Sequence, residues 1–146
     1  MDDCVRTQRK DNLRLASLGN ELAWFLSACL RGEKKRMDGE DAELVKEGLS
    51  YARDVQKGYE IELNCLIHGV VISKQTLRFL EVLHETKDVM SPSDVDDVKD
   101  VLSSVVEKGP KNLDKSKLEN VVHVFRKLTK HALKNPVYPE AFREII

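Results

Sequence analysis

Apolar residues recur in steps of three and four along most of the chain, which is the spacing of one face of an α-helix. The first such segment runs from about Asp11 to Arg31, and Gly32 follows at the position where a left-handed C-cap is expected. The charged run 33–40 then predicts a solvated loop. The inward positions of this first helix are Leu15, Leu18, Leu22, Phe25 or Leu26, and Cys29.

A second helix is expected to begin near Asp41, with Gly58 as a candidate end. Residues 59–65 then alternate apolar and polar side chains, which is a strand pattern. The only other candidate strand, 70–72, is three residues long, and an isolated two-stranded hairpin is marginal. We therefore favour a helix through 59–72. The positions that support this helix are Tyr59, Leu63, Leu66 and Val70, and those facing inward before them are Leu44, Val45, Leu49, Ala52 and Val55.

Hydroxyl caps mark the start of two further helices. Ser73 can cap the third, and Ser91 followed by Pro92 and several acidic residues is the expected start of the fourth. Gly109 and Pro110 end the fourth helix. The inward positions of the third are Leu77, Leu80 and Leu83, widened by Phe79 and Val82, and those of the fourth are Val95, Val98, Leu102 and Val105.

The fifth helix has the clearest pattern, from about Lys115 to Lys134, and a short tail helix is expected within 139–146. No repeat or interdomain linker interrupts the 146 residues, a length typical of one domain. The sequence predicts an all-α fold, a compact bundle of four to five helices with a short C-terminal helix, in one domain over residues 1–146. The inward positions of the fifth helix are Leu118, Val121 or Val122, Phe125, Leu128 and Ala132.

Composition is that of a folded chain, with 41% hydrophobic and 34% charged residues. The net charge of −1 favours neither a nucleic-acid binder nor an acidic decoy. The charges are nevertheless segregated, because 81–107 carries eight acidic and two basic residues and 108–134 carries two acidic and eight basic ones. The two segments therefore have net charges of −6 and +6.

Three cysteines, an odd number with no CxxC spacing, argue against a disulfide framework and favour a reducing compartment. The first twelve residues lack the apolar stretch of a secretory signal, and no apolar run approaches the ~20 residues that span a bilayer. We expect a cytoplasmic protein without membrane contact.

Signatures of phosphate and metal sites are absent or incomplete. Neither GxxxxGK[ST] nor GxGxxG occurs. Glu81 and His84 form one Glu-x-x-His motif where a di-metal bundle needs two, and Cys65 with His68 is at most half of a zinc site. We expect no metal and no cofactor, with His84 partly buried at the edge of its helix's core face.

Arg126 and His131 are separated by four residues, a spacing that resembles the Arg-x4-to-6-His signature of HEPN domains, helical-bundle proteins that include metal-independent ribonucleases. The resemblance covers this motif and the helical character of the chain. It implies that Arg126 steadies phosphate charge and that His131 takes part in proton transfer. The chain departs from the family at Lys127, where another polar residue is often found, and Arg78 with His84 also fits the permissive spacing.

A basic face runs along the fifth helix, within about 100° of arc and opposite its apolar positions. This face suits a nucleic-acid backbone or another acidic partner, although no aromatic residues are interleaved to stack bases. The alternative is a solvated face that offsets the acidic fourth helix. We call it the basic face. It belongs to the predicted helix 115–134 and is formed by His123, Arg126, Lys127, Lys130 and Lys134.

No motif identifies an enzyme, and the sequence best fits a noncatalytic protein-interaction or scaffold module with a protein partner or with self-association. Two alternatives remain open. One is a nucleic-acid or acidic-partner binder that uses the basic face, and the other is a HEPN-like ribonuclease that uses Arg126 and His131.

Overall fold

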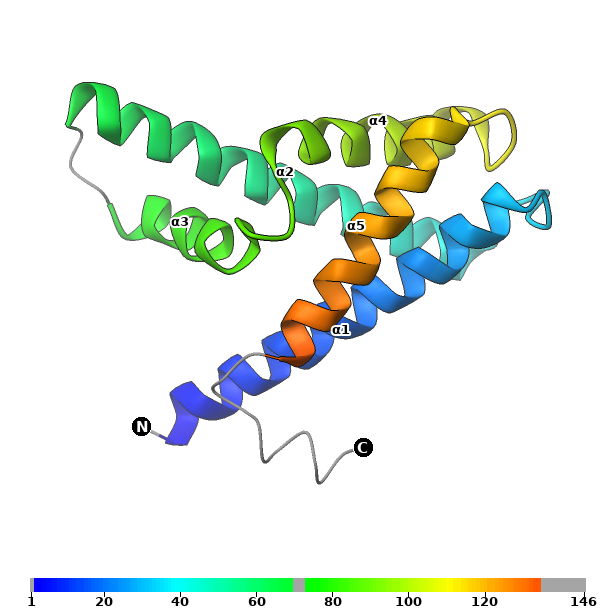
Figure 1. The fold of residues 1–146 in the computed structure, drawn as a ribbon. Helices are drawn as coiled ribbons and strands as arrows, with labels where there is room; N and C mark the ends of the chain where they lie inside the picture. The colour runs from blue at the N-terminus through cyan, green and yellow to red at the C-terminus, as the bar shows by residue number, and fades with distance from the viewer. Residues whose placement is uncertain (1, 70–72, 135–146) are drawn as a thin grey trace.

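The computed structural model describes residues 2–69 and 73–134, without the side chains of 2–12 and of His68. Within these residues the chain forms five helices and no strand (Figure 1), which confirms the all-α prediction. The expected helix at 139–146 lies outside the described residues. The helices are α1 (Asp2–Leu30), α2 (Gly39–His68), α3 (Lys74–Thr86), α4 (Pro92–Lys108) and α5 (Lys115–Leu133).

Each helix after α1 begins at a polar side chain that accepts a backbone N–H of the first turn, which satisfies a donor that the helix leaves without a partner. In α2 and α4 the third helical residue, Asp41 or Asp94, bonds back to the cap and completes a capping box. The predicted starts at Ser73 and Ser91 are thereby confirmed. The four caps are Asp38, Ser73, Ser91 and Asp114.

One predicted helix boundary is wrong, and one candidate boundary is absent. Helix α1 begins at Asp2 rather than near Asp11, because residues 2–10 include few apolar side chains and show no period to detect. Helix α2 runs through Gly58 and ends at His68, where Gly69 has a left-handed backbone (φ +61°). The helix prediction is thus confirmed for 59–68, and 70–72 lie outside the described residues.

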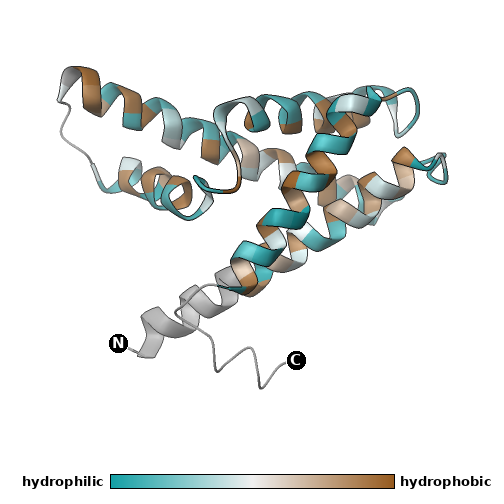
Figure 2. Cartoon of the chain, in the orientation of Figure 1, coloured by the Kyte–Doolittle hydropathy of each residue, from teal (hydrophilic) through white to brown (hydrophobic). Residues whose placement is uncertain are grey.

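The core joins all five helices in one cluster of buried, mainly aliphatic side chains. Every predicted inward position of α4 and α5 is buried. Figure 2 shows these helices with apolar and polar residues on different sides, as an amphipathic helix requires. None of the helices in the described part of the chain is both long and apolar enough to cross a membrane.

Helices α1 and α5 pack side by side along much of their length (Figure 1), at a crossing built on small residues. A Cβ added at Gly19 would lie 2.6 Å from Thr129 Oγ1 and 3.0 Å from the Phe125 carbonyl oxygen. Thr129 Oγ1 also donates to the Ala16 carbonyl at 3.3 Å. The missing side chain therefore lets the two backbones approach.

Helix α2 is the longest element and contacts three others in turn. Its Gly48 lies against Leu22 of α1 and Leu102 of α4, and its Gly58 lies against the Phe79 backbone and Leu83 of α3. Thirty residues make α2 about 45 Å long, whereas the thirteen of α3 make only about 20 Å. The α2–α3 pair projects from the rest of the bundle, in a different direction from the α1–α5 pair (Figure 1).

Candidate functional site

Large apolar side chains are exposed together on the projecting α2–α3 pair. Leu63, Leu66 and Ile67 of α2 are 57%, 78% and 63% exposed, and Leu77 of α3 is 46% exposed. The three α2 residues lie within about 100° of arc on one side of the helix. We call these four residues the apolar tip.

Leu77 and His84 correct two sequence predictions. Leu77 was expected in the core, but it lies in the first turn of α3 and faces the cleft beside α2, whereas Leu83 near the end of α3 is buried. His84 was expected to be partly buried, but its side chain is exposed in the same cleft. Both errors have the same cause. Helix α3 packs against α2 on one side only, so α2 covers only part of the apolar face of α3.

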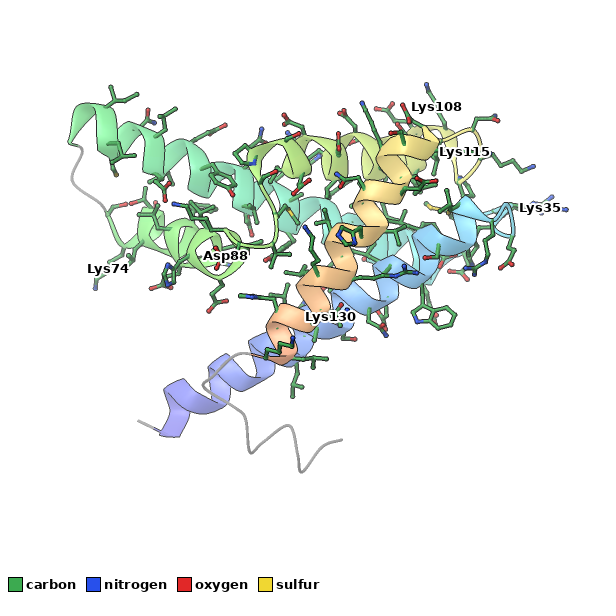
Figure 3. All side chains as sticks on the ribbon, viewed as in Figure 1. Lys35, Lys74, Asp88, Lys108, Lys115 and Lys130 are labelled. Carbon is green, nitrogen blue, oxygen red and sulfur yellow. The ribbon has the colours of Figure 1, made fainter. Side chains whose placement is uncertain are left out.

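Two clefts flank Leu66. The α2–α3 cleft has a volume of about 700 Å³ and includes Leu77 and Leu80 of α3, whereas the α2–α4 cleft has about 380 Å³ and includes Pro92 and Val95 of α4. Leu66 and Glu62 of α2 line both clefts. In Figure 3 the labels Lys74 and Asp88 mark the two ends of the α3 segment that forms one wall.

The apolar tip is uncovered because the chain turns into α4 before the end of α2. Tyr59 Oη donates to the Met90 carbonyl at 2.6 Å, and Lys87 Nζ donates to Glu62 Oε1 at 2.9 Å. These contacts hold the α3–α4 connection beside residues 59–62 of α2. Helix α4 starts there, at Pro92, and α2 continues beyond this point to His68 with α3 beside it (Figure 1).

The clefts have an acidic lining. Their charged residues are five carboxylates and one lysine, and both carboxylate oxygens of Glu62 accept from that lysine, Lys87. The Glu62 contact raises the pKa of Lys87 above its ordinary value. The carboxylates are Glu60, Glu62, Glu81, Glu85 and Asp96.

The two cysteines with described side chains lie in different surroundings. Cys65 lines the α2–α3 cleft, whereas the Cys29 thiol is buried in the core and burial raises its pKa to about 11, which leaves it protonated at neutral pH. Among the described residues no group of three or more His, Cys, Asp or Glu could hold a metal ion. The Cys65–His68 pair cannot be placed, because the His68 side chain is outside the described residues.

The basic face of α5 is largely exposed. One edge of this face lies toward α1, the other edge lies toward α4, and the centre is open. Arg126 Nη2 donates to Ser27 Oγ of α1 at 3.3 Å, whereas Lys127 lies near Asp94 of α4. His123, Lys130 and Lys134 are exposed between them, and Figure 3 labels Lys130 on α5 where it crosses in front of α1.

Asp94 shows the influence of this face on the acidic helix. Burial raises the pKa of Asp94, but hydrogen bonds from Asn120 and Ser91, with the nearby Lys127 charge, outweigh burial and lower it below its ordinary value. Further along α4, Asp100 pairs with Lys117 at 3.0 Å. The α5 cations at the α4 side therefore offset acidic charge, and those in the centre of the face do not.

Arg126 and His131 do not converge. Residues five positions apart on a helix are separated by about 140° around its axis. The Arg126 side chain leans onto α1, and the exposed His131 lies on another side of α5. Within one chain, the two side chains that the HEPN-like motif pairs therefore do not share a face.

Sequence reasoning missed the apolar tip, although a signal was present. The end of α2 has apolar residues on two sides, with Ile61 buried against the protein and Leu63, Leu66 and Ile67 on the other side. A helix that is apolar on most of its circumference requires a second neighbour. No family model matches this chain, and neither a curated protein nor a solved structure matches it.

Proposed function

We propose that this protein is a noncatalytic interaction module that docks a helical segment of a partner protein on the apolar tip. The observation that carries the proposal is the group of four exposed apolar side chains at two clefts that meet at Leu66. Contiguous exposed apolar surface is characteristic of interaction sites in water-soluble chains, whereas isolated exposed apolar residues are common. We also propose a cytoplasmic location, supported by the odd cysteine number without CxxC spacing.

A helix is the occupant that best suits this surface. Helix α2 continues beyond the start of α4, so a helix laid along the exposed side of its last turns would continue the packing of α4. Helix-in-groove recognition places residues at i, i+3 or i+4, and i+7 into such a groove. Removing apolar surface from water contributes about 25 cal/mol per Å², which makes Leu66 the expected energetic centre.

Charge argues against pairing of two copies through this surface. A two-fold dimer brings the same patch of both copies together, so the acidic linings of the clefts would face each other. Like charges across an interface are unfavourable. We therefore place a different protein on the apolar tip, and self-association is an outcome that the test must be able to reveal.

The test is a selection from a displayed library of helical peptides in which both the apolar face and the flanking positions are randomised. Binders to the wild-type protein are counter-screened against Leu66→Glu and against the control Val106→Glu. Val106 is also an exposed apolar residue, at 49%, but lies ten residues beyond Asp96 on α4, about 15 Å away from the clefts.

We expect selected helices to lose binding at least tenfold to Leu66→Glu and to keep it with Val106→Glu. If no enriched helix depends on Leu66, the docking proposal fails. Sedimentation of the protein alone completes the test, because a dimer that Leu66→Glu converts to a monomer would assign the apolar tip to a second copy.

A second candidate function is binding of a nucleic-acid backbone or another polyanion by the basic face. It is supported by the exposed central residues His123, Lys130 and Lys134. Labelled single-stranded RNA titrated over a salt series tests it, because phosphate contacts weaken steeply with salt. Reversal of Lys127, Lys130 and Lys134 should abolish such binding. Loss of cleavage, but not of binding, in His131→Ala would instead support the HEPN-like alternative.

A further inference from the structure

The acidic lining of the clefts borders the apolar tip on both sides. Glu81 belongs to α3 and lines the α2–α3 cleft, whereas Asp96 belongs to α4 and lines the α2–α4 cleft. Leu66 lines both clefts and lies between these walls. A helix resting on Leu66 would therefore have a carboxylate along each of its long edges.

Few cations lie at the two clefts. Lys57 pairs with Glu60 at 4.0 Å, and Lys99 donates to Gln56 of the α2–α4 cleft at 2.6 Å. Lys87 is the only lysine or arginine among the residues lining the two clefts, and it is held by Glu62. Arg78 of α3 lines a neighbouring cleft together with Arg14 of α1, and Glu81 lies on the border between that cleft and the α2–α3 cleft. Glu81 and Asp96 are both exposed and are available to a partner.

We propose that the partner segment is a basic amphipathic helix, with an apolar stripe for the apolar tip and lysine or arginine on both flanks of that stripe. This inference rests on the proposed docking function and adds the chemistry of the partner. The apolar stripe supplies most of the affinity, since surface charge pairs contribute little individually. The flanking cations fix the position of the helix and reject acidic competitors.

The same charge pattern accelerates association. The carboxylates of the two cleft linings attract a cationic helix over distances up to the Debye length, about 8 Å at physiological salt. Electrostatic attraction acts mainly on the association rate and is lost at high salt. The apolar contacts persist at high salt and govern dissociation.

The experiment uses the Leu66-dependent helices from the library selection. Their flanking positions are sequenced, and the strongest binder is titrated against wild type, the double variant Glu81→Lys/Asp96→Lys and the control Glu119→Lys. Glu119 is an exposed carboxylate on α5, outside both clefts. Each titration is made at about 0.05 M and at 1 M salt, where the Debye length falls to about 3 Å.

We expect lysine and arginine to be enriched at the flanks, and the double variant to bind about tenfold more weakly than wild type at low salt. This difference should shrink to less than about twofold at 1 M salt, with Glu119→Lys equal to wild type. Leu66-dependent helices with neutral or acidic flanks, or equal binding by the double variant, would overturn the charge inference and leave docking intact. The absence of any Leu66-dependent helix would instead remove the docking function itself.

Discussion

Single residues decide how closely the helices approach each other. Gly58 was a candidate helix end in the sequence, yet it lies inside α2 and is buried against α3. Glycine is unfavourable in a helix interior, so its presence there indicates that another backbone occupies the space of a side chain. The sequence shows the glycine but not the neighbour, which explains why Gly58 remained a candidate helix end in the sequence.

Replacing Gly58 with alanine should destabilise the protein by about 1–3 kcal/mol, because the new Cβ would lie 2.6 Å from the Phe79 carbonyl oxygen and 2.8 Å from Leu83 Cβ. Gly39→Ala is the matched control on the same helix, where nothing lies within 4 Å of the added Cβ. It should be neutral or stabilising by up to about 1 kcal/mol. Urea unfolding of both variants checks the difference, and equal stabilities would contradict the close α2–α3 approach.

Tyr51 joins α2 to α3 through a partly buried hydrogen bond with Thr86, whose hydroxyl also donates to the Val82 carbonyl at 2.7 Å. Burial raises the pKa of Tyr51 to about 12, although the Thr86 contact lowers it in part. Because the folded pKa lies above the unfolded value, this contribution to stability is complete below pH 10 and is lost as pH rises from about 10 to 12.

Tyr51→Phe should therefore lower stability at neutral pH by about 1–2 kcal/mol through the lost hydrogen bond. Above pH 10, the stability of the variant should fall less steeply than that of wild type, because one raised pKa has been removed. Urea unfolding of both proteins at pH 8, 10.5 and 11.5 measures this difference. Cys29 and the lysines are present in both proteins, so their titration cancels when the two stabilities are subtracted. Parallel pH profiles would show that Tyr51 is not buried as described.

At the scale of elements, caps and apolar periods were sufficient to locate most helices. Ser73, Ser91 and Gly109 gave correct ends because capping chemistry is local, and all predicted inward positions of α4 and α5 are buried. The start of α1 could not be found, since residues 2–10 have no apolar period. The exposure of Leu77 could not be found either, because it depends on which helix covers α3.

The capping box of α4 provides a test at this scale. Ser91→Ala removes the acceptor for the Asp94 N–H, which lies 3.1 Å from Ser91 Oγ, and should cost about 1 kcal/mol. Ser93→Ala, at an exposed position two residues later, should change stability by less than about 0.5 kcal/mol. Thermal unfolding of both variants measures the effect. Equal losses of stability in the two variants would contradict the capping role of Ser91, because they would reflect only the removal of a hydroxyl.

At the scale of the whole molecule, the sequence contained the charge segregation but not its arrangement. Packing α4 beside α5 brings Asp94 near Lys127 and Asp100 onto Lys117, so part of each charged segment offsets the other. The acidic residues at the clefts and the centre of the basic face remain at the surface. The apolar residues on two sides of the end of α2 are visible in the sequence, but the exposure of the apolar tip depends on where α4 begins beside α2, which no local pattern encodes.

The apolar tip should contribute little to folding, because its side chains are already exposed. Leu66→Glu is expected to change the free energy of unfolding by less than about 0.5 kcal/mol. Leu83→Ala, at a fully buried leucine of α3, should cost about 2–5 kcal/mol. Urea unfolding compares the two, and a large loss in Leu66→Glu would place Leu66 inside the folded core.

The central claim is that a partner helix binds the apolar tip, and amide chemical shifts measured during titration with a Leu66-dependent helix test it most directly. The account predicts shift changes confined to 59–69, 74–87 and 92–96, with those of 123–134 unchanged. Changes concentrated on 123–134, the basic face of α5, would contradict the claim and assign binding to the other surface.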